Sequence, residues 1–186
     1  MRRSHSARSR GRGGPQPFLA VWSADPMMLA DLRAEVHLPG FCIRPPGNYK
    51  FTQRPGPAGA TAFVWRGAAR SDGTAPFLRV VITTHPPVGQ PMPTVETPLG
   101  RLLEGARRPR DEWQQTSTEI GQVSGLTFGR VRWSGIEPAM GARTHGFIYV
   151  AVEGRRTIEL SSQDVEPHHE TALKVAEASA LTFRKL

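Results

Sequence analysis

The stretch that decides the fold is RVRWSGIEPAMGARTHGFIYVAVEGRRTIEL, residues 130–160. Its central run, FIYVAV at 147–152, has apolar side chains in both alternating sets. A strand with one face in water alternates apolar and polar residues, so this pattern predicts a strand that is covered on both faces. The run LTFGRVRW at 126–133 also has apolar residues in both phases. The sequence therefore indicates a central sheet between two covering layers.

Runs rich in β-branched and aromatic residues recur along the chain, and turns rich in glycine and proline separate them. Glu153-Gly154 supplies the glycine of a tight hairpin. The links between the runs are too short for crossover helices, which favours antiparallel pairing. The expected strands begin at Gly40, Thr61 and Ala75 and continue with Thr118–Gln122, Leu126–Trp133, Thr144–Val152 and Arg155–Ser161.

Apolar residues at helical spacing predict two amphipathic helices, Pro98–Arg108 and Pro167–Ser179. Asp25 and Pro26 are typical of a helix start and predict a short helix from about Pro26 to Glu35. The fold expected from these elements is an α+β fold, with a central antiparallel β-sheet of about six to seven strands flanked by helices on both faces.

The chain divides by composition into three parts. Residues 1–16 form a disordered basic tail, residues 17–37 a short N-terminal helix segment, and residues 38–186 the main domain. The net charge is +8, and five arginines without any acid lie in residues 1–14. The folded part is therefore only mildly basic, whereas the tail could bind polyanions non-specifically.

Cellular location is predicted from what the sequence lacks. Cys42 is the only cysteine, so the fold requires no disulfide and no oxidising compartment. The apolar run FLAVW at 18–22 is shorter than the about 7–15 residues of an export signal. No run reaches the roughly 18 apolar residues of a membrane span. We expect a cytoplasmic protein, or an exported one if the true start of the chain lies elsewhere.

The residues with catalytic potential are His145, His168 and His169. None belongs to an HxH, HExxH or Cys–His arrangement, and no phosphate-binding glycine motif is present. His168 and His169 are adjacent at a helix start, where neighbouring side chains point about 100° apart and do not readily share a metal. We therefore predict no enzyme activity, no catalytic, cofactor-binding or metal-binding residues, and no cofactor.

Two chemical alternatives stay open at this stage. His145 could form an acid–base pair with Glu137 or Asp164, and Glu166 and Glu170 could complete a metal site with His168 and His169.

The order of elements resembles the PsbP-like family of α/β/α sandwich domains, which includes bacterial members of unknown function. The resemblance covers about Leu38 to Phe183. It is carried by LPGFCIRPPGNY at 38–49, TPLGRLLEGA at 97–106, TEIGQVSGLTFGRVRWSG at 118–135, GFIYVAVEGRRTIELSSQDVEP at 146–167 and ALTFR at 180–184. The resemblance implies a non-enzymatic fold that mostly binds other proteins.

The expected function is accordingly a non-enzymatic accessory or binding module that engages another protein. The connections Pro86–Pro93 and Ser134–Arg143 are the expected contact surfaces, because loops on rigid scaffolds often carry recognition. One alternative is association with nucleic acid or another polyanion through residues 1–14, assisted by Arg107, Arg108 and Arg110. The other is an uncharacterised enzyme or metal-binding protein that uses His145 or the pair His168 and His169.

Overall fold

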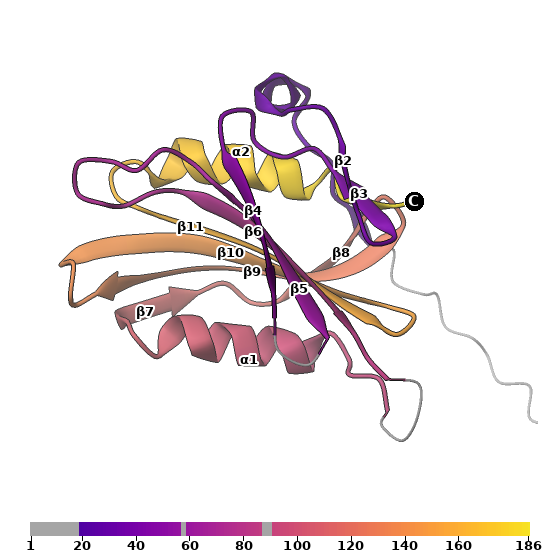
Figure 1. The fold of residues 1–186 in the computed structure, drawn as a ribbon. Coiled ribbons are helices and arrows are strands. Elements are labelled where there is room, and N and C mark those ends of the chain that lie inside the picture. Colours follow the sequence, from indigo (N-terminus) through magenta and orange to yellow (C-terminus); the bar gives the residue numbers. More distant parts are fainter. Residues whose placement is uncertain (1–18, 57–58, 87–90) are drawn as a thin grey trace, which may run out of the picture.

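The computed structural model describes residues 19–56, 59–86 and 91–186, and its main feature is a nine-stranded sheet (Figure 1). The strands are paired in the order β1-β8-β9-β10-β11-β6-β5-β4, and β7 also pairs with β9. All these pairs are antiparallel except β1 with β8. The strands are β1 (Ala20–Val21), β4 (Lys50–Pro55), β5 (Ala60–Arg66), β6 (Phe77–Thr84), β7 (Asp111–Gln115), β8 (Glu119–Val123), β9 (Leu126–Glu137), β10 (Ala142–Glu153) and β11 (Arg156–Val165).

A second, three-stranded sheet ties the end of the chain to its beginning. It has the order β12-β3-β2, formed by β12 (Arg184–Lys185), β3 (Phe41–Ile43) and β2 (Val36–Leu38). The helices are the short 3₁₀ helix η1 (Pro26–Asp31), α1 (Glu96–Arg107) and α2 (His169–Ala180). Among the described residues, no helix is long and apolar enough to cross a membrane.

The central strand β10 is buried on both of its faces. Phe147 and Tyr149 belong to one hydrophobic cluster, to which α2 contributes Ala176. Ile148 and Val150, between them in sequence, belong to a second cluster, against which α1 packs. The two helices lie on opposite sides of the sheet (Figure 1). The apolar residues in both phases of the sequence thus correspond to two separate cores.

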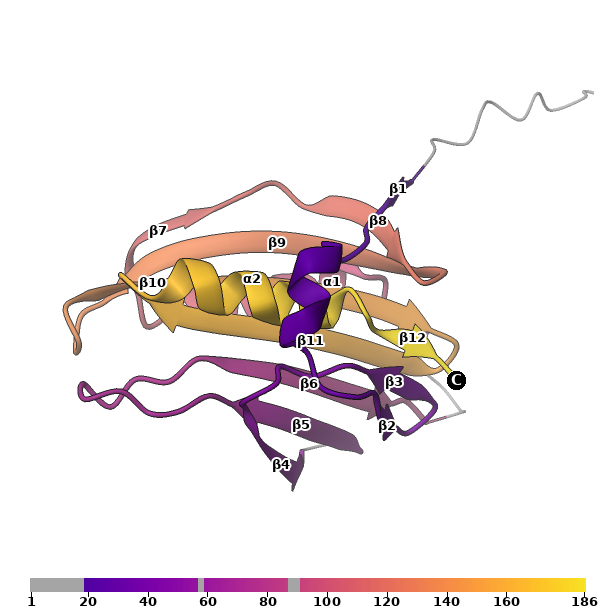
Figure 2. The same ribbon diagram turned by 90° about the horizontal axis from the view of Figure 1, so that it is seen from above.

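Coverage by the two helices is unequal. Helix α1 packs on β9 and β10, at the middle of the sheet. Strands β4, β5 and β6 lie together at one side of the sheet, away from α2 in the view from above (Figure 2). The outer surface of β4–β6 on the α1 side therefore has no helix over it, which matters for the candidate sites below.

The predicted count of six to seven strands was too low. The strands that the sequence did not reveal are β1, β2, β4 and β7, which are short or exposed. All six residues of β4 are exposed, and so are four of the five residues of β7. Such strands form through backbone hydrogen bonds to a neighbouring strand. Their sequences lack the alternation of apolar and polar residues from which a strand is predicted.

Two expected segments differ from the observed ones. The helix expected to reach Glu35 ends at Asp31, because Leu32 makes a β-bridge to Pro46 and β2 begins at Val36. The loose connection expected over Ser134–Arg143 is mostly strand, because the β9–β10 ladder continues to its last pair, Glu137 with Ala142. The predicted basic tail, residues 1–16, lies outside the described residues.

Gly146 tests the tight packing of β10. A Cβ at this position would lie 2.5 Å and 2.6 Å from ring atoms of Trp133 and 2.7 Å from the carbonyl oxygen of Ser162. Gly146→Ala should therefore lower the free energy of unfolding by about 1–3 kcal/mol through overpacking. The measurement is the midpoint of denaturant unfolding at unchanged slope.

Gly100 in α1 provides the matched control, because a Cβ there would meet no atom within 4 Å. Gly100→Ala should raise the free energy of unfolding by about 0.5–1 kcal/mol, the helix preference of alanine over glycine. Equal midpoints for the Gly146→Ala variant and the wild-type chain would show that Trp133 does not pack on β10 as described.

Candidate functional site

A cluster of two histidines and a glutamate forms where β10, β11 and α2 meet. His145 lies on β10, Glu166 directly follows β11, and His169 is the first residue of α2. The rings of His145 and His169 are stacked, with centroids 3.8 Å apart and planes at 13°. Nε2 of His145 lies 2.8 Å from Oε1 of Glu166. One potential ligand atom from each of the three lies within 4.8 Å of the others.

The electrostatics of this cluster favour charge on the glutamate. The hydrogen bond with His145 lowers the pKa of Glu166, which is itself exposed. Nδ1 of His169 is buried and has no hydrogen-bond partner among the described residues. A buried polar atom without a partner is costly, and binding a metal would supply one. The donor set of two imidazoles and a carboxylate suits zinc or a similar divalent transition metal.

The structure rearranges the candidates expected from the sequence. His145 and His169 come together, whereas His168 is exposed and outside the cluster. The acids expected beside His145 have other partners. Arg110 lies 3.7 Å from Glu137, and Arg70 holds the buried Asp164 with two hydrogen bonds of 2.6 Å and 2.7 Å.

The acid that pairs with His145 is Glu166. The expected β10–β11 hairpin already brings residues 145 and 164 opposite each other. That register was the signal from which the proximity of Glu166, two residues beyond, could have been inferred.

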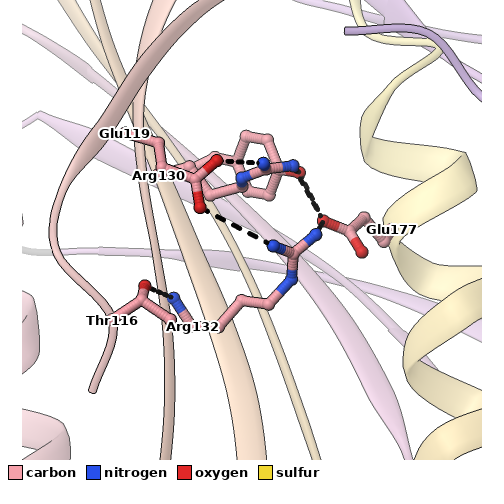
Figure 3. A network of polar contacts seen from close by, with 6 residues as sticks. Thr116, Glu119, Arg130, Arg132 and Glu177 are labelled. Carbon is pink, nitrogen blue, oxygen red and sulfur yellow. Dashed lines mark hydrogen bonds and ion pairs between the residues drawn. The ribbon is translucent and has the colours of Figure 1, made fainter.

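A second polar cluster includes Glu119, Arg130, Arg132 and Glu177 (Figure 3) and surrounds the buried Tyr149. Its hydroxyl donates to Oε1 of Glu177 at 2.6 Å and accepts from Nη1 of Arg130 at 3.1 Å. Arg132 donates to the same Glu177 oxygen at 2.7 Å, and Arg130 also pairs with Glu119. Burial first, and the charge of Glu177 second, raise the pKa of Tyr149, so the phenol stays protonated as a donor.

The Tyr149 cluster connects structural elements and leaves little polar capacity for a ligand. Arg130 and Arg132 come from β9, Glu119 from β8 and Glu177 from α2. The guanidinium carbon of Arg130 also lies 4.2 Å from the ring centroid of Trp22, next to β1. These contacts fix the N-terminal segment and α2 on the sheet, which is a structural role.

The three arginines that could assist polyanion binding are separated in the structure. Arg107 and Arg108 are exposed at the end of α1. The side chain of Arg110 is only 6% exposed, and its guanidinium lies 4.6 Å from the ring centroid of Trp133. Burial lowers the pKa of Arg110. Three neighbouring cations in the sequence thus form no single anion site.

A concavity lies on the uncovered surface of β4–β6. It is a hollow of about 950 Å³. Its lining includes four exposed cationic residues and a half-buried apolar floor of Ala62, Val64 and Phe77. We refer to it as the basic hollow, and the cations that define it are Lys50, Arg54, Arg66 and Arg79.

Comparisons with known proteins place the chain by its fold. No protein-family model matches it, and no curated protein matches its sequence. A solved structure from Bacteroides thetaiotaomicron superposes with a TM-score of 0.50 at 11% identity, over 83% of this chain and 48% of that one. The chain thus spans about half the length of that protein.

Two further structures match over nearly their whole length. Cyanobacterial PsbP from Synechocystis superposes with a TM-score of 0.56 at 14% identity, over 96% of this chain and 98% of that one. LpqN from Mycobacterium tuberculosis, described as involved in cell envelope biogenesis, has a TM-score of 0.55 at 12% identity, over 91% and 98%. The resemblance expected from the sequence is confirmed at the level of architecture: the chain has the PsbP-like fold.

Proposed function

We propose that this protein is a non-catalytic accessory module whose role is to bind another protein. The observation that carries the proposal is the basic hollow, an open concave surface whose cations have no partner within the described part of the chain. Around Tyr149, by contrast, charged side chains pair with one another. Its fold likeness to PsbP and LpqN supports an accessory role.

The basic hollow is a better contact surface than the two loops expected from the sequence. Of the Pro86–Pro93 connection, residues 87–90 lie outside the described residues. The Ser134–Arg143 connection is reduced to the turn 138–141 between β9 and β10. The hollow instead lies on paired strands of the main sheet, so its lining side chains already stand side by side before a partner binds.

Protein binding predicts a stoichiometric complex with a purified partner. Affinity capture with the full chain from native lysate, followed by mass spectrometry, should identify a protein that then binds the purified chain saturably in calorimetry. A screen for hydrolase, transferase and redox turnover should return no activity. Repeated failure to obtain such a complex, together with measurable turnover by the purified chain, would reverse the assignment.

Metal binding is a second candidate function, and the His145–Glu166–His169 cluster favours it. Around a tetrahedral zinc the ligand atoms would move from within 4.8 Å to a separation of roughly 3.3 Å, and the two stacked imidazole rings would tilt so that both lone pairs point at the ion. Three protein ligands would leave one coordination position open.

Association of polyanions with residues 1–14 remains a prediction, because those residues lie outside the described part.

Zinc titration of the purified chain tests the metal site. Calorimetry should give one site, and His145→Ala or His169→Ala should weaken binding by at least about tenfold. Affinity should also fall in acid, because protonated imidazoles do not bind metals. His168→Ala is the matched control and should bind as the wild type does. Equal losses in all three variants, or no stoichiometric binding, would remove this candidate.

A further inference from the structure

The cations of the basic hollow stand in register across three strands. Lys50 on β4 lies directly opposite Arg66 on β5, which in turn lies opposite Phe77 on β6. In the next row of the same surface, Val64 lies between Thr52 and Arg79. Residues directly opposite each other on one face are close enough to interact, and like charges there are destabilising. The Lys50–Arg66 pair therefore works against the stability of the sheet.

No acid of the described residues forms an ion pair with these cations, and only Glu159 acts on one of them, Arg79, through its charge. Among the described residues, none of the four cations forms an ion pair within 4.0 Å, whereas Arg70, Arg130 and Arg143 each hold a carboxylate. The residues outside the described ranges, 1–18, 57–58 and 87–90, contain no aspartate or glutamate. The positive charge of the hollow is thus left for an external anion.

The nearest strand beyond β6 is β11, and its acid on the α1 side, Glu159, already pairs with an arginine. Glu159 on β11 lies opposite Val81 of β6, is only 6% exposed, and lies 3.3 Å from Arg101 of α1. Burial raises the pKa of Glu159, an effect that the charges of Arg101 and Arg79 partly offset. With Arg101 added along its border, the uncovered surface presents cations to the solvent from both β4–β6 and α1.

The floor of the hollow distinguishes between polyanions. Ala62, Val64 and Phe77 are half-buried apolar side chains between the cations. A nucleic-acid duplex offers phosphates but nothing apolar for this floor, and a single strand binds by stacking bases on exposed aromatic rings. The only aromatic residue lining the hollow is the half-buried Phe77. An extended peptide with alternating side chains offers carboxylates and apolar groups at strand spacing.

We propose that the basic hollow binds an extended acidic segment of the partner protein, whose carboxylates pair with Lys50, Arg54, Arg66 and Arg79 while intervening apolar side chains contact Val64 and Phe77. The proposal rests on the protein-binding function and adds its surface and the chemistry of the partner. Among the described residues β4 is also the terminal strand of the sheet, and no strand among them pairs with its outer edge, where the segment could add.

The test uses the full-length chain and a fluorescent peptide in which glutamate alternates with valine, followed by anisotropy. Arg66→Gln combined with Arg79→Gln should weaken binding by about tenfold, since two charge pairs are lost. The control combines Arg107→Gln with Lys174→Gln, two exposed cations outside the hollow, one on each helix. It changes the net charge equally and should leave binding within about twofold of wild type.

Further measurements in the same assay test whether binding depends on the acidic side chains of the peptide. Binding should weaken with added salt and disappear when glutamine or lysine replaces the glutamates of the peptide. The hollow variant should unfold at about the same temperature as the wild type, because removing the Lys50–Arg66 repulsion offsets the lost effect of Arg79 on Glu159. That result would show that lost binding does not come from lost folding.

Several outcomes would overturn the inference. Equal losses in the two double variants would show that net charge alone binds the peptide. Duplex or single-stranded DNA that binds more tightly than the peptide, and depends on Arg66 and Arg79, would identify the ligand as a nucleic acid. A captured protein partner that binds the hollow variant as tightly as the wild type would leave the protein-binding function intact and refute only this surface.

Discussion

The structure depends on the burial of β10 on both of its faces. Five consecutive residues, Phe147 to Ala151, are each at most 4% exposed. A strand of this kind requires a layer on either side, and the chain supplies α2 for one side and α1 for the other. Because α1 is only 12 residues long and lies over β9 and β10, the same side of β4–β6 stays open. The candidate binding surface is thus a consequence of how the core is covered.

The polar residues sort by their position relative to that core. Near Tyr149, charged groups from β8, β9 and α2 satisfy one another at the edge of the larger cluster, and Arg70 holds Asp164 in the interior. The cations of the basic hollow have no such partners within the described residues. Where a network is satisfied internally, it contributes specificity of folding. Where like charges lie opposite each other, as Lys50 and Arg66 do in the basic hollow, their repulsion lowers the stability of the sheet. That surface is then available to bind an anionic partner.

Much of the fold could be predicted because its signals are local. The apolar phases of β9–β11 and the helical spacing of α1 and α2 depend on burial, which leaves a mark in the sequence. The exposed strands β4 and β7 leave none, because backbone pairing alone defines them. The candidate sites were harder still. The approach of His145 to Glu166 depends on the exact register of a hairpin, and the basic hollow depends on which half of the sheet α1 leaves uncovered.

Hydrogen exchange of individual backbone amides tests the two-sided burial of β10 most directly. Amides of Phe147–Ala151 should exchange only through global unfolding, whereas the solvent-facing edge of β4 should exchange through local opening at a much lower free energy. A denaturant series would separate the two, since only global opening depends steeply on denaturant. If the β10 amides instead exchange as readily as those of β4, the strand is not enclosed between two layers, and the account of both the core and the open hollow is wrong.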